Sequence, residues 1–250
     1  YVSGLIGAPW VNAGAMTNKG VEFTLNTRNI LTHDFTWTSG LTFSINRNEV
    51  TKLYSESSAI SGINGNETLT YTMVGEPVGQ FYGYKVIGMF KEESDFYKKD
   101  ADGNFQLDEA GNRIRIAIPK GQQISKNGIW VGDYIYEDLH EDGVIDEKDR
   151  TFLGNPAPKF TFGFNNYFAY KGFDLNIFLN GSVGNKAVNL IRRTFTDPMR
   201  NSNLLKEATD IALIGMHDPE VGDEELSNVY IVNADRAKVQ RVTTSSANDN

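Results

Sequence analysis

The sequence predicts an all-β fold, an antiparallel transmembrane β-barrel wall that carries long extracellular loops. Four segments alternate strictly between apolar and polar residues, which is the pattern of a sheet with two unlike faces. These segments are about ten residues long or longer, as tilted membrane strands are, whereas strands of soluble proteins usually have about 5–6 residues. The connections between them are very short on one side and long on the other, as in outer-membrane barrels.

The first two strands are predicted over residues 20–28 and 34–46, joined by a tight turn at 30–33. One face of this pair is apolar, and the alternate residues are mostly Thr, Ser, Asn and Gly. Small uncharged residues of this kind suit a water-filled interior. The apolar set comprises Val21, Phe23, Leu25, Phe35, Trp37, Leu41, Phe43 and Ile45.

The second pair of strands is predicted over residues 159–170 and 173–183, with the tight turn at 170–172. Its apolar face is rich in aromatic residues, and we expect this face to contact lipid. The apolar set comprises Phe160, Phe162, Phe164, Phe168, Phe173, Leu175, Ile177 and Leu179.

The remaining sequence is expected to form extracellular loops on a single partial β-barrel domain, residues 1–250. The first loop region spans residues 47–158 and includes strands near 71–74 and 80–90. The second loop region spans residues 186–250, is expected to be truncated, and includes short helices near 187–196 and 203–215. We expect no plug domain within this chain.

Composition excludes several classes of function. The net charge of −8 and the lack of a basic stripe disfavour a nucleic-acid partner. The chain has no cysteine, which excludes disulfide scaffolds and thiolate metal sites. It has no G-x-S-x-G, H-E-x-x-H or phosphate-binding glycine motif. Its three histidines, His33, His140 and His217, lie far apart in the sequence, so no enzyme activity is predicted.

Residues 138–149 form an acidic loop whose spacing is similar to the twelve-residue calcium loop of EF-hands. Gly143 would allow the sharp bend at position six, and a bound Ca²⁺ would have a structural role. Two residues depart from the pattern, His140 at position three and the short Asp149 at position twelve. The alternative is a metal-free surface turn. The candidate ligands are Asp138, Asp142, the Val144 carbonyl, Asp146 and Asp149.

Two further groups of residues are candidates for contact with a substrate or a partner. Phe81, Tyr82 and Tyr84 could stack on sugar rings or pack against a partner protein, although a local hydrophobic core is the simpler explanation. The polar face of the strands could line a substrate path or simply hydrate the interior. Its candidate residues are Glu22, Asn26, Asn165, Asn176 and Asn180.

Four stretches together resemble the SusC/RagA family of TonB-dependent outer-membrane transporters. They are PWVNAGAMTNKGVEFTLN at 9–26, FYGYKVIGMF at 81–90, GDYIYEDL with DGVID and DR at 132–150, and FLGNPAPKFTFGFNNYFAYKGFDLNIFLNGSVGN at 152–185. The resemblance spans most of residues 9–185, and DGVID followed by GNPAPKFTFGFNN is its most specific part. His140 departs from the Asn that is usual in the family at that loop position.

The resemblance implies a plugged barrel of about 22 strands, of which this chain would supply a small part of the wall. It also implies a bacterial outer-membrane location, a SusD-like surface lipoprotein as partner, and energy supplied by TonB through a plug region that is missing here. The imported nutrient would be an oligosaccharide or a peptide.

Two other functions remain open from the residues alone. A soluble, calcium-stabilised β-sandwich that binds carbohydrate would bury the apolar face against a second sheet. A glycoside hydrolase would need two carboxylates on one cleft, and the sequence does not indicate such a pair. A transporter wall, by contrast, would leave the apolar face uncovered by protein.

Overall fold

A computed structural model describes residues 14–54, 59–64, 67–197 and 203–243 of the chain. Residues 9–13, at the start of the family-like stretches, lie outside this described part. The chain divides into two compact units, which are described separately. Unit 1 comprises residues 1–83 and 152–187, and unit 2 comprises residues 84–151 and 188–250. No helix among the described residues is long and apolar enough to cross a bilayer.

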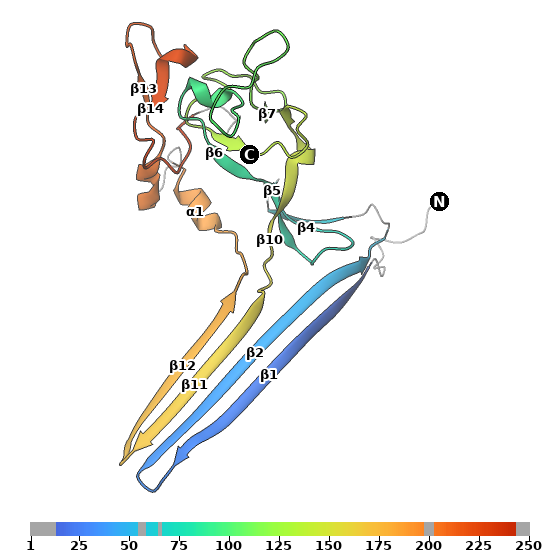
Figure 1. Cartoon of the computed structure of the whole chain (residues 1–250), viewed down its shortest axis with the longest axis vertical. Coiled ribbons are helices and arrows are strands. Elements are labelled where there is room, and N and C mark those ends of the chain that lie inside the picture. Colours follow the sequence, from blue (N-terminus) through green and yellow to red (C-terminus); the bar gives the residue numbers. More distant parts are fainter. Residues whose placement is uncertain (1–13, 55–58, 65–66, 198–202, 244–250) are drawn as a thin grey trace, which may run out of the picture. The chain divides into compact units, whose positions relative to one another are not determined.

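Unit 1 is built on a four-stranded antiparallel sheet, here called the wall sheet, with strand order β1-β2-β11-β12. Figure 1 shows these strands side by side, with both hairpin turns at the same end of the sheet. The prediction of long antiparallel strands is confirmed. The strands are β1 (Ala15–Leu31), β2 (Phe35–Lys52), β11 (Phe160–Tyr170) and β12 (Phe173–Val183).

The first two strands are longer than the sequence predicts. β1 begins five residues earlier than expected, and β2 continues six residues further, with 17 and 18 residues respectively. Apolar alternation stops near Lys19 and Arg47, but backbone pairing continues beyond them to Ala15 opposite Lys52. Apolar alternation in the sequence therefore locates only the part of a strand that has an apolar face. Backbone hydrogen bonds continue the strand beyond that part.

The turn between β11 and β12 has two residues, one fewer than predicted. Lys171 and Gly172 both adopt positive φ, at 45° and 87°. This conformation is typical of a type I′ turn, whose twist matches that of the strands it joins. Glycine adopts it without strain, whereas lysine does so at a cost.

A second sheet of unit 1 has the strand order β10-β5-β4-β3. The Tyr82 ring lies between two other aromatic rings, stacked on Tyr71 at 4.7 Å and edge-on to Phe152 at 5.5 Å. The strands are β3 (Ile60–Asn64), β4 (Glu67–Thr72), β5 (Gln80–Tyr84) and β10 (Arg150–Gly154), so β5 and β10 each reach into unit 2.

Unit 2 combines the two regions that the sequence suggests as separate loops. Its core takes Phe90, Phe96 and Trp130 from residues 84–151, and Val229 and Ile231 from residues 188–250. The Phe90 and Phe96 rings stack at 4.1 Å. Short strand pairs surround this core: β6 (Val86–Met89) with β8 (Tyr134–Tyr136), β13 (Ile214–Met216) with β14 (Val229–Ile231), and the parallel pair β7 (Ile118–Pro119) and β9 (Val144–Ile145).

A buried ion pair joins the two segments of unit 2. The Arg241 guanidinium donates to both carboxylate oxygens of Asp133, at 2.9 and 3.1 Å, and to the carbonyls of Lys126 and Gly128. The Asp133 carboxylate also accepts the Trp130 amide. A buried charge pair is stable only with such complete hydrogen bonding.

The predicted helices in the second loop region are shorter in the structure. The first is α1 (Leu190–Phe195), which the Asn189 side chain caps by accepting the Arg192 amide. In place of the second, residues 206–210 form the 3-10 helix η3 (Lys206–Asp210). Three more short 3-10 helices are η1 (Glu93–Phe96), η2 (Glu147–Asp149) and η4 (Leu226–Asn228).

Candidate functional site

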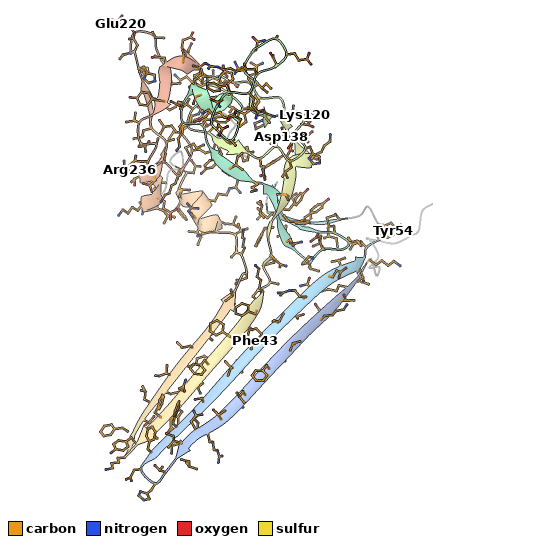
Figure 2. All side chains as sticks on the ribbon, viewed as in Figure 1. Phe43, Tyr54, Lys120, Asp138, Glu220 and Arg236 are labelled. Atoms are coloured by element: carbon orange, nitrogen blue, oxygen red, sulfur yellow. The ribbon has the colours of Figure 1, made fainter. Side chains whose placement is uncertain are left out.

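Most apolar side chains of the four wall strands lie on one face of the wall sheet. Residues directly opposite each other on neighbouring strands share a face, so the register fixes which side chains gather. One row contains Phe23, Phe43 and Phe162. The next row contains Leu25, Leu41, Phe164 and Leu179. Phe43 projects from the middle part of the sheet in Figure 2.

This apolar face is exposed in unit 1. Val21, Phe173 and Leu175 are 67%, 82% and 56% exposed. Phe162, Phe164 and Ile177 are each about two-fifths exposed, and Phe160 is partly buried. A soluble sandwich would bury these side chains against a second sheet. Their exposure matches the expectation for a wall that faces lipid.

Aromatic rings gather at both ends of the apolar face. Near the hairpin turns, Trp37 stacks on Phe168 at 5.7 Å, and Phe35 meets Tyr170 edge-on at 6.4 Å. Towards the other end, the Phe160 ring lies 5.4 Å from Phe43. Membrane barrels carry aromatic girdles in this way at both interfaces.

The length of the apolar face matches a bilayer. Ile45 lies ten positions after Phe35, which is roughly 34 Å along a strand. A strand tilt of about 40° reduces this to roughly 26 Å, close to the apolar band of about 25 Å in outer-membrane barrels. Just beyond the last apolar pair, Lys19 lies opposite Arg47, so charge begins where the band ends.

One row of the apolar face is polar, which sequence reasoning missed. Ser39 lies opposite Asn166, whose side-chain oxygen accepts the Trp37 indole N–H at 3.0 Å and the Ser39 hydroxyl at 2.7 Å. Asn29 donates to the same hydroxyl at 2.6 Å. Asn166 is only 7% exposed. Polar groups in an apolar layer are tolerated when they bond to one another, as these do.

The opposite face of the wall sheet holds the predicted polar residues together. Glu22 shares a row with Ser44, Asn180 with Gly163, and Asn165 with Gly40. Asn176 and Asn26 belong to the same face. The Asn165 side-chain oxygen is buried and accepts no hydrogen bond. Phe178 and Tyr167 also lie on this face, so it is less uniformly small and polar than the sequence suggests.

In the acidic loop, residues 138–149, the carboxylates bind backbone amides. Asp138 accepts the Gly143 amide at 2.9 Å, and Asp142 accepts the Val144 amide at 3.1 Å. Asp146 and Asp149 form a capping box around η2. The Val144 backbone belongs to β9, which pairs with β7. Gly143 adopts φ of 84°, as the predicted bend requires.

Asp149 is the centre of this loop and is only 1% exposed. Its carboxylate accepts the amides of Leu139, His140 and Asp146, at 3.0, 3.3 and 2.8 Å. Burial alone would raise the pKa of Asp149, but these amides outweigh burial and lower it. The carboxylate is therefore held ionised by backbone donors.

The hydrogen bonds of the acidic loop also affect which of its oxygens could bind calcium. Among the described residues, no three His, Asp or Glu side chains lie close enough together to hold a metal ion. One oxygen of Asp138 is buried and accepts no hydrogen bond. Within the described part of the chain, the acidic loop thus has one buried carboxylate oxygen without a hydrogen-bond donor but not the arranged ligand set that calcium needs, and a calcium site stays a prediction.

The three aromatic candidates do not form one platform. Tyr82 belongs to the ring stack of unit 1. Tyr84 packs on Tyr136 at 5.7 Å, and the Arg150 guanidinium lies 5.0 Å from its ring. Phe81 follows Gln80 in β5 and points to the opposite face from Tyr82. Local packing therefore occupies Tyr82 and Tyr84.

Comparison with known proteins finds similarity to TonB-dependent receptors. No family model matches the chain. The TonB-dependent receptor P3 of Formosa agariphila is 35% identical over 182 residues, which are 71% of this chain and 16% of the receptor. Receptor P26 of the same organism is 32% identical over 73% of this chain and 16% of its own length. The TonB-dependent receptor SusC of Bacteroides thetaiotaomicron is 24% identical over 93% of this chain and 20% of its own length.

Solved structures share the fold. The RagAB peptide transporter matches with a TM-score of 0.60 and 19% identity, over 98% of this chain and 22% of the other. The RagAB peptide importer in its closed-closed state matches with a TM-score of 0.54 and 20% identity, over 87% of this chain and 20% of the other. The chain spans 16% to 20% of the length of the curated relatives. Within the region that it spans, the chain resembles TonB-dependent receptors of the SusC/RagA type.

Proposed function

We propose that this chain forms part of the membrane wall and extracellular loops of a TonB-dependent transporter that imports nutrients across a bacterial outer membrane. The observation that carries the proposal is the exposed apolar face of the wall sheet, bordered by aromatic rings at both ends. A water-soluble protein rarely exposes such a large apolar patch. Lipid contact gives the apolar side chains of this face a favourable environment.

The strand edges support the same proposal. β1 and β12 are the edge strands of the wall sheet within the described part of the chain. Their outer backbone N–H and C=O groups need partners in a bilayer, because hydrocarbon offers no hydrogen bonds. Neighbouring strands of a closed barrel would supply these partners. The polar face would then line the interior, with Glu22, Asn165, Asn176 and Asn180 along the substrate path.

The partner and the substrate are part of the proposal. We infer a SusD-like surface lipoprotein as partner, and energy from TonB through a plug region, because the relatives are TonB-dependent receptors and one of them is SusC. The substrate class is an oligosaccharide or a peptide. Uptake of labelled oligosaccharides and peptides by cells with and without TonB would separate these classes, and uptake that is independent of TonB would contradict the mechanism. We propose no enzyme activity.

Spin labels on single cysteines test the wall directly, in a protein from which any cysteine outside residues 1–250 has been removed; residues 1–250 contain none. The labels would be placed on the full-length protein in lipid bilayers at Leu25, Leu41 and Leu179 of the apolar face. Matched labels at Thr24, Thr42 and Asn180 would occupy the other face. Relaxation by oxygen, which concentrates in lipid, should dominate at the first set, and relaxation by a water-soluble nickel chelate at the second.

The outcome distinguishes the alternatives. Alternation between oxygen and nickel with a period of two residues supports a wall between lipid and water. If the first set is shielded from both reagents, the apolar face is covered by protein, as in a sandwich, and the proposal fails. It also fails if both sets are equally open to nickel.

For the acidic loop we propose a structural Ca²⁺, supported by the unpaired Asp138 oxygen and by the spacing of the loop. Calorimetric titration of the full-length protein with calcium tests it. Binding that is lost in Asp138→Asn would support the site. Equal binding by this variant and the wild type would contradict it.

A further inference from the structure

Residues 97–115 of unit 2 form a small three-stranded structure, here called the meander. Its segments pair through Tyr97 opposite Arg115, Lys99 opposite Phe105, and Leu107 opposite Arg113. Backbone hydrogen bonds of 2.8–2.9 Å link Lys98 to Ile114, Gln106 to Lys98 and Ile114 to Gln106. The meander is therefore an ordered platform, although it is too short to be a regular sheet.

Two matching turns hold the meander in shape. In the first, Asp100 accepts the backbone amides of Asp102 and Asn104 at 3.0 and 2.8 Å. In the second, Asp108 accepts those of Ala110 and Asn112 at 2.9 and 2.8 Å. Such turns fix the backbone locally.

The core of unit 2 anchors both ends of the meander. Phe96, immediately before it, is fully buried, and Ala117, just after it, is 3% exposed. The meander is thus held at its base while its outer face remains open.

Arginine and aromatic side chains alternate on the outer face of the meander. The Arg113 guanidinium lies 4.1 Å from the Phe105 ring centre and 5.6 Å from that of Tyr97. The Arg115 guanidinium lies 5.3 Å from the Tyr97 ring centre. The Tyr97 and Phe105 rings meet edge-on at 5.9 Å. A guanidinium on a ring face is held by cation–π attraction, while its N–H groups stay free at its edge.

Neither guanidinium forms an ion pair with any carboxylate in the described ranges. This is notable because the chain carries 32 acidic residues and only 24 basic ones. Both arginines are exposed. The nearby Lys99, by contrast, already pairs with Asp95 at 3.5 Å. Arg113 and Arg115 therefore keep their donors available for an external acceptor.

We propose that the outer face of the meander binds a ligand that carries several carboxylate groups, with Arg113 and Arg115 each binding one of them. The two residues are two positions apart on an extended segment, so their side chains emerge roughly 7 Å apart on one face. Each stacked guanidinium can bind one carboxylate through two parallel N–H bonds. Tyr97 and Phe105 hold the guanidiniums in place and offer apolar contact beside them.

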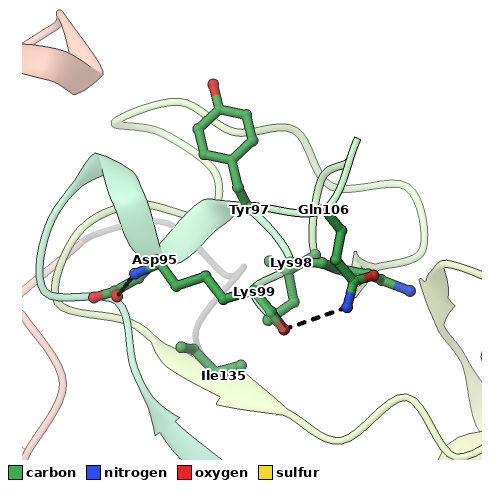
Figure 3. A pocket seen from close by; sticks show the side chains of 7 residues that line it. Asp95, Tyr97, Lys98, Lys99, Gln106 and Ile135 are labelled. Carbon is green, nitrogen blue, oxygen red and sulfur yellow. Dashed lines mark hydrogen bonds and ion pairs between the residues drawn. The ribbon is translucent and has the colours of Figure 1, made fainter. Parts of the chain in front are cut away.

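The outer face borders a hollow beside the meander, and Tyr97 lines both. That hollow has a volume of about 300 Å³ and is lined by Lys98, Gln106, Ile116 and Ile135, among others. In Figure 3 the Tyr97 ring points away from Ile135, although both residues line the hollow. Gln106 donates to the Lys99 carbonyl within this region at 3.3 Å.

The test measures binding of two polycarboxylates to the full-length protein: an oligogalacturonate, with one carboxylate on each sugar, and a pentaglutamate peptide. Maltopentaose and pentaglutamine serve as neutral counterparts. We expect at least one polycarboxylate to bind and both neutral compounds to fail. The double variant Arg113→Gln with Arg115→Gln should weaken binding about 100-fold, because each charge-assisted contact contributes about tenfold or more. Which polycarboxylate binds identifies the carrier of the carboxylates as sugar or peptide.

A matched control removes the same charge elsewhere. Lys120→Gln with Arg236→Gln changes two exposed cations of unit 2, both labelled in Figure 2, outside the meander. This control should bind like the wild type. Arg113→Lys with Arg115→Lys keeps the charge but removes the planar fork, so it should bind at least several-fold more weakly.

Three results would overturn the proposal: no binding of either polycarboxylate, equal weakening in the Lys120 and Arg236 control, or undiminished binding in the lysine variant. Thermal unfolding checks that each variant is folded. If the glutamine variant does not fold, the lysine variant decides alone. Binding can be measured without transport, so failure here leaves the proposed function untouched.

Discussion

At the scale of single residues, carboxylates in this chain mainly organise backbone. Asp100, Asp108 and Asp149 each accept two or more main-chain amides. Hydrogen bonds from backbone amides lower the pKa of Asp100 and Asp108, although slight burial acts in the opposite direction. Turn and loop geometry therefore accounts for these three aspartates.

Asp149→Asn should destabilise the acidic loop by about 1–3 kcal/mol, because the amide offers one acceptor where the carboxylate offers two. Amide hydrogen exchange of residues 138–149 at pH 7 measures this as faster exchange. Asp142→Asn, at an exposed position with one backbone contact, is the control and should change exchange much less. Equal effects of the two variants would show that Asp149 is not the centre of the loop.

The pH dependence follows from the lowered pKa of Asp149. A carboxyl with a lower pKa in the folded state stabilises that state above its unfolded pKa of about 3.9, and the stabilisation disappears as pH falls through the folded value. The difference in unfolding temperature between wild type and Asp149→Asn should therefore be full at pH 7 and shrink below about pH 4. A difference that grows on acidification would contradict the assigned shift.

At the scale of elements, the sequence pattern predicts the wall sheet well and its details less well. A slip of one residue would turn every apolar side chain to the other face, so alternation also specifies register. The polar row around Asn166 escapes this reasoning, because its partner Ser39 lies 127 positions away. The stacking of Arg113 on Phe105 likewise depends on the chain folding back through the turn at residues 108–112.

The β11–β12 hairpin offers a test at this scale. Lys171 has φ of 45°, where asparagine is tolerated much better than lysine. Lys171→Asn should stabilise the wall by about 0.5–1 kcal/mol, seen as a higher unfolding temperature of the full-length protein in detergent. Lys171→Gln, which has the same backbone constraint as lysine, should leave that temperature unchanged. A gain with Gln would point to charge rather than turn geometry.

At the scale of the whole molecule, the sequence separates wall strands from loops but does not reveal that residues 84–151 and 188–250 share one core. No local pattern indicates that Phe90 and Val229 pack in the same cluster. Contacts between distant segments are set by the three-dimensional fold, and periodicity reports only local structure. The family resemblance, by contrast, can be recognised from the sequence alone, because each of its motifs is a continuous stretch of residues.

An arginine on the apolar face tests the wall as a whole. Leu41 lies near the middle of that face, so Leu41→Arg should destabilise the inserted protein by about 2–4 kcal/mol. Thr42→Arg, on the neighbouring residue of the other face, should have little effect. Heat-modified mobility on gels, together with the amount of protein in the outer membrane, measures both. Similar loss in both variants would contradict a wall with one lipid face.

The buried pair of Asp133 and Arg241 has a consequence for the order of folding. Each wall hairpin, β1–β2 and β11–β12, consists of strands that are neighbours in the chain, so its pairing needs no distant segment. Asp133, by contrast, would be buried as an uncompensated charge until Arg241, 108 residues later, arrives. The core of unit 2 therefore cannot be completed before residue 241 is available.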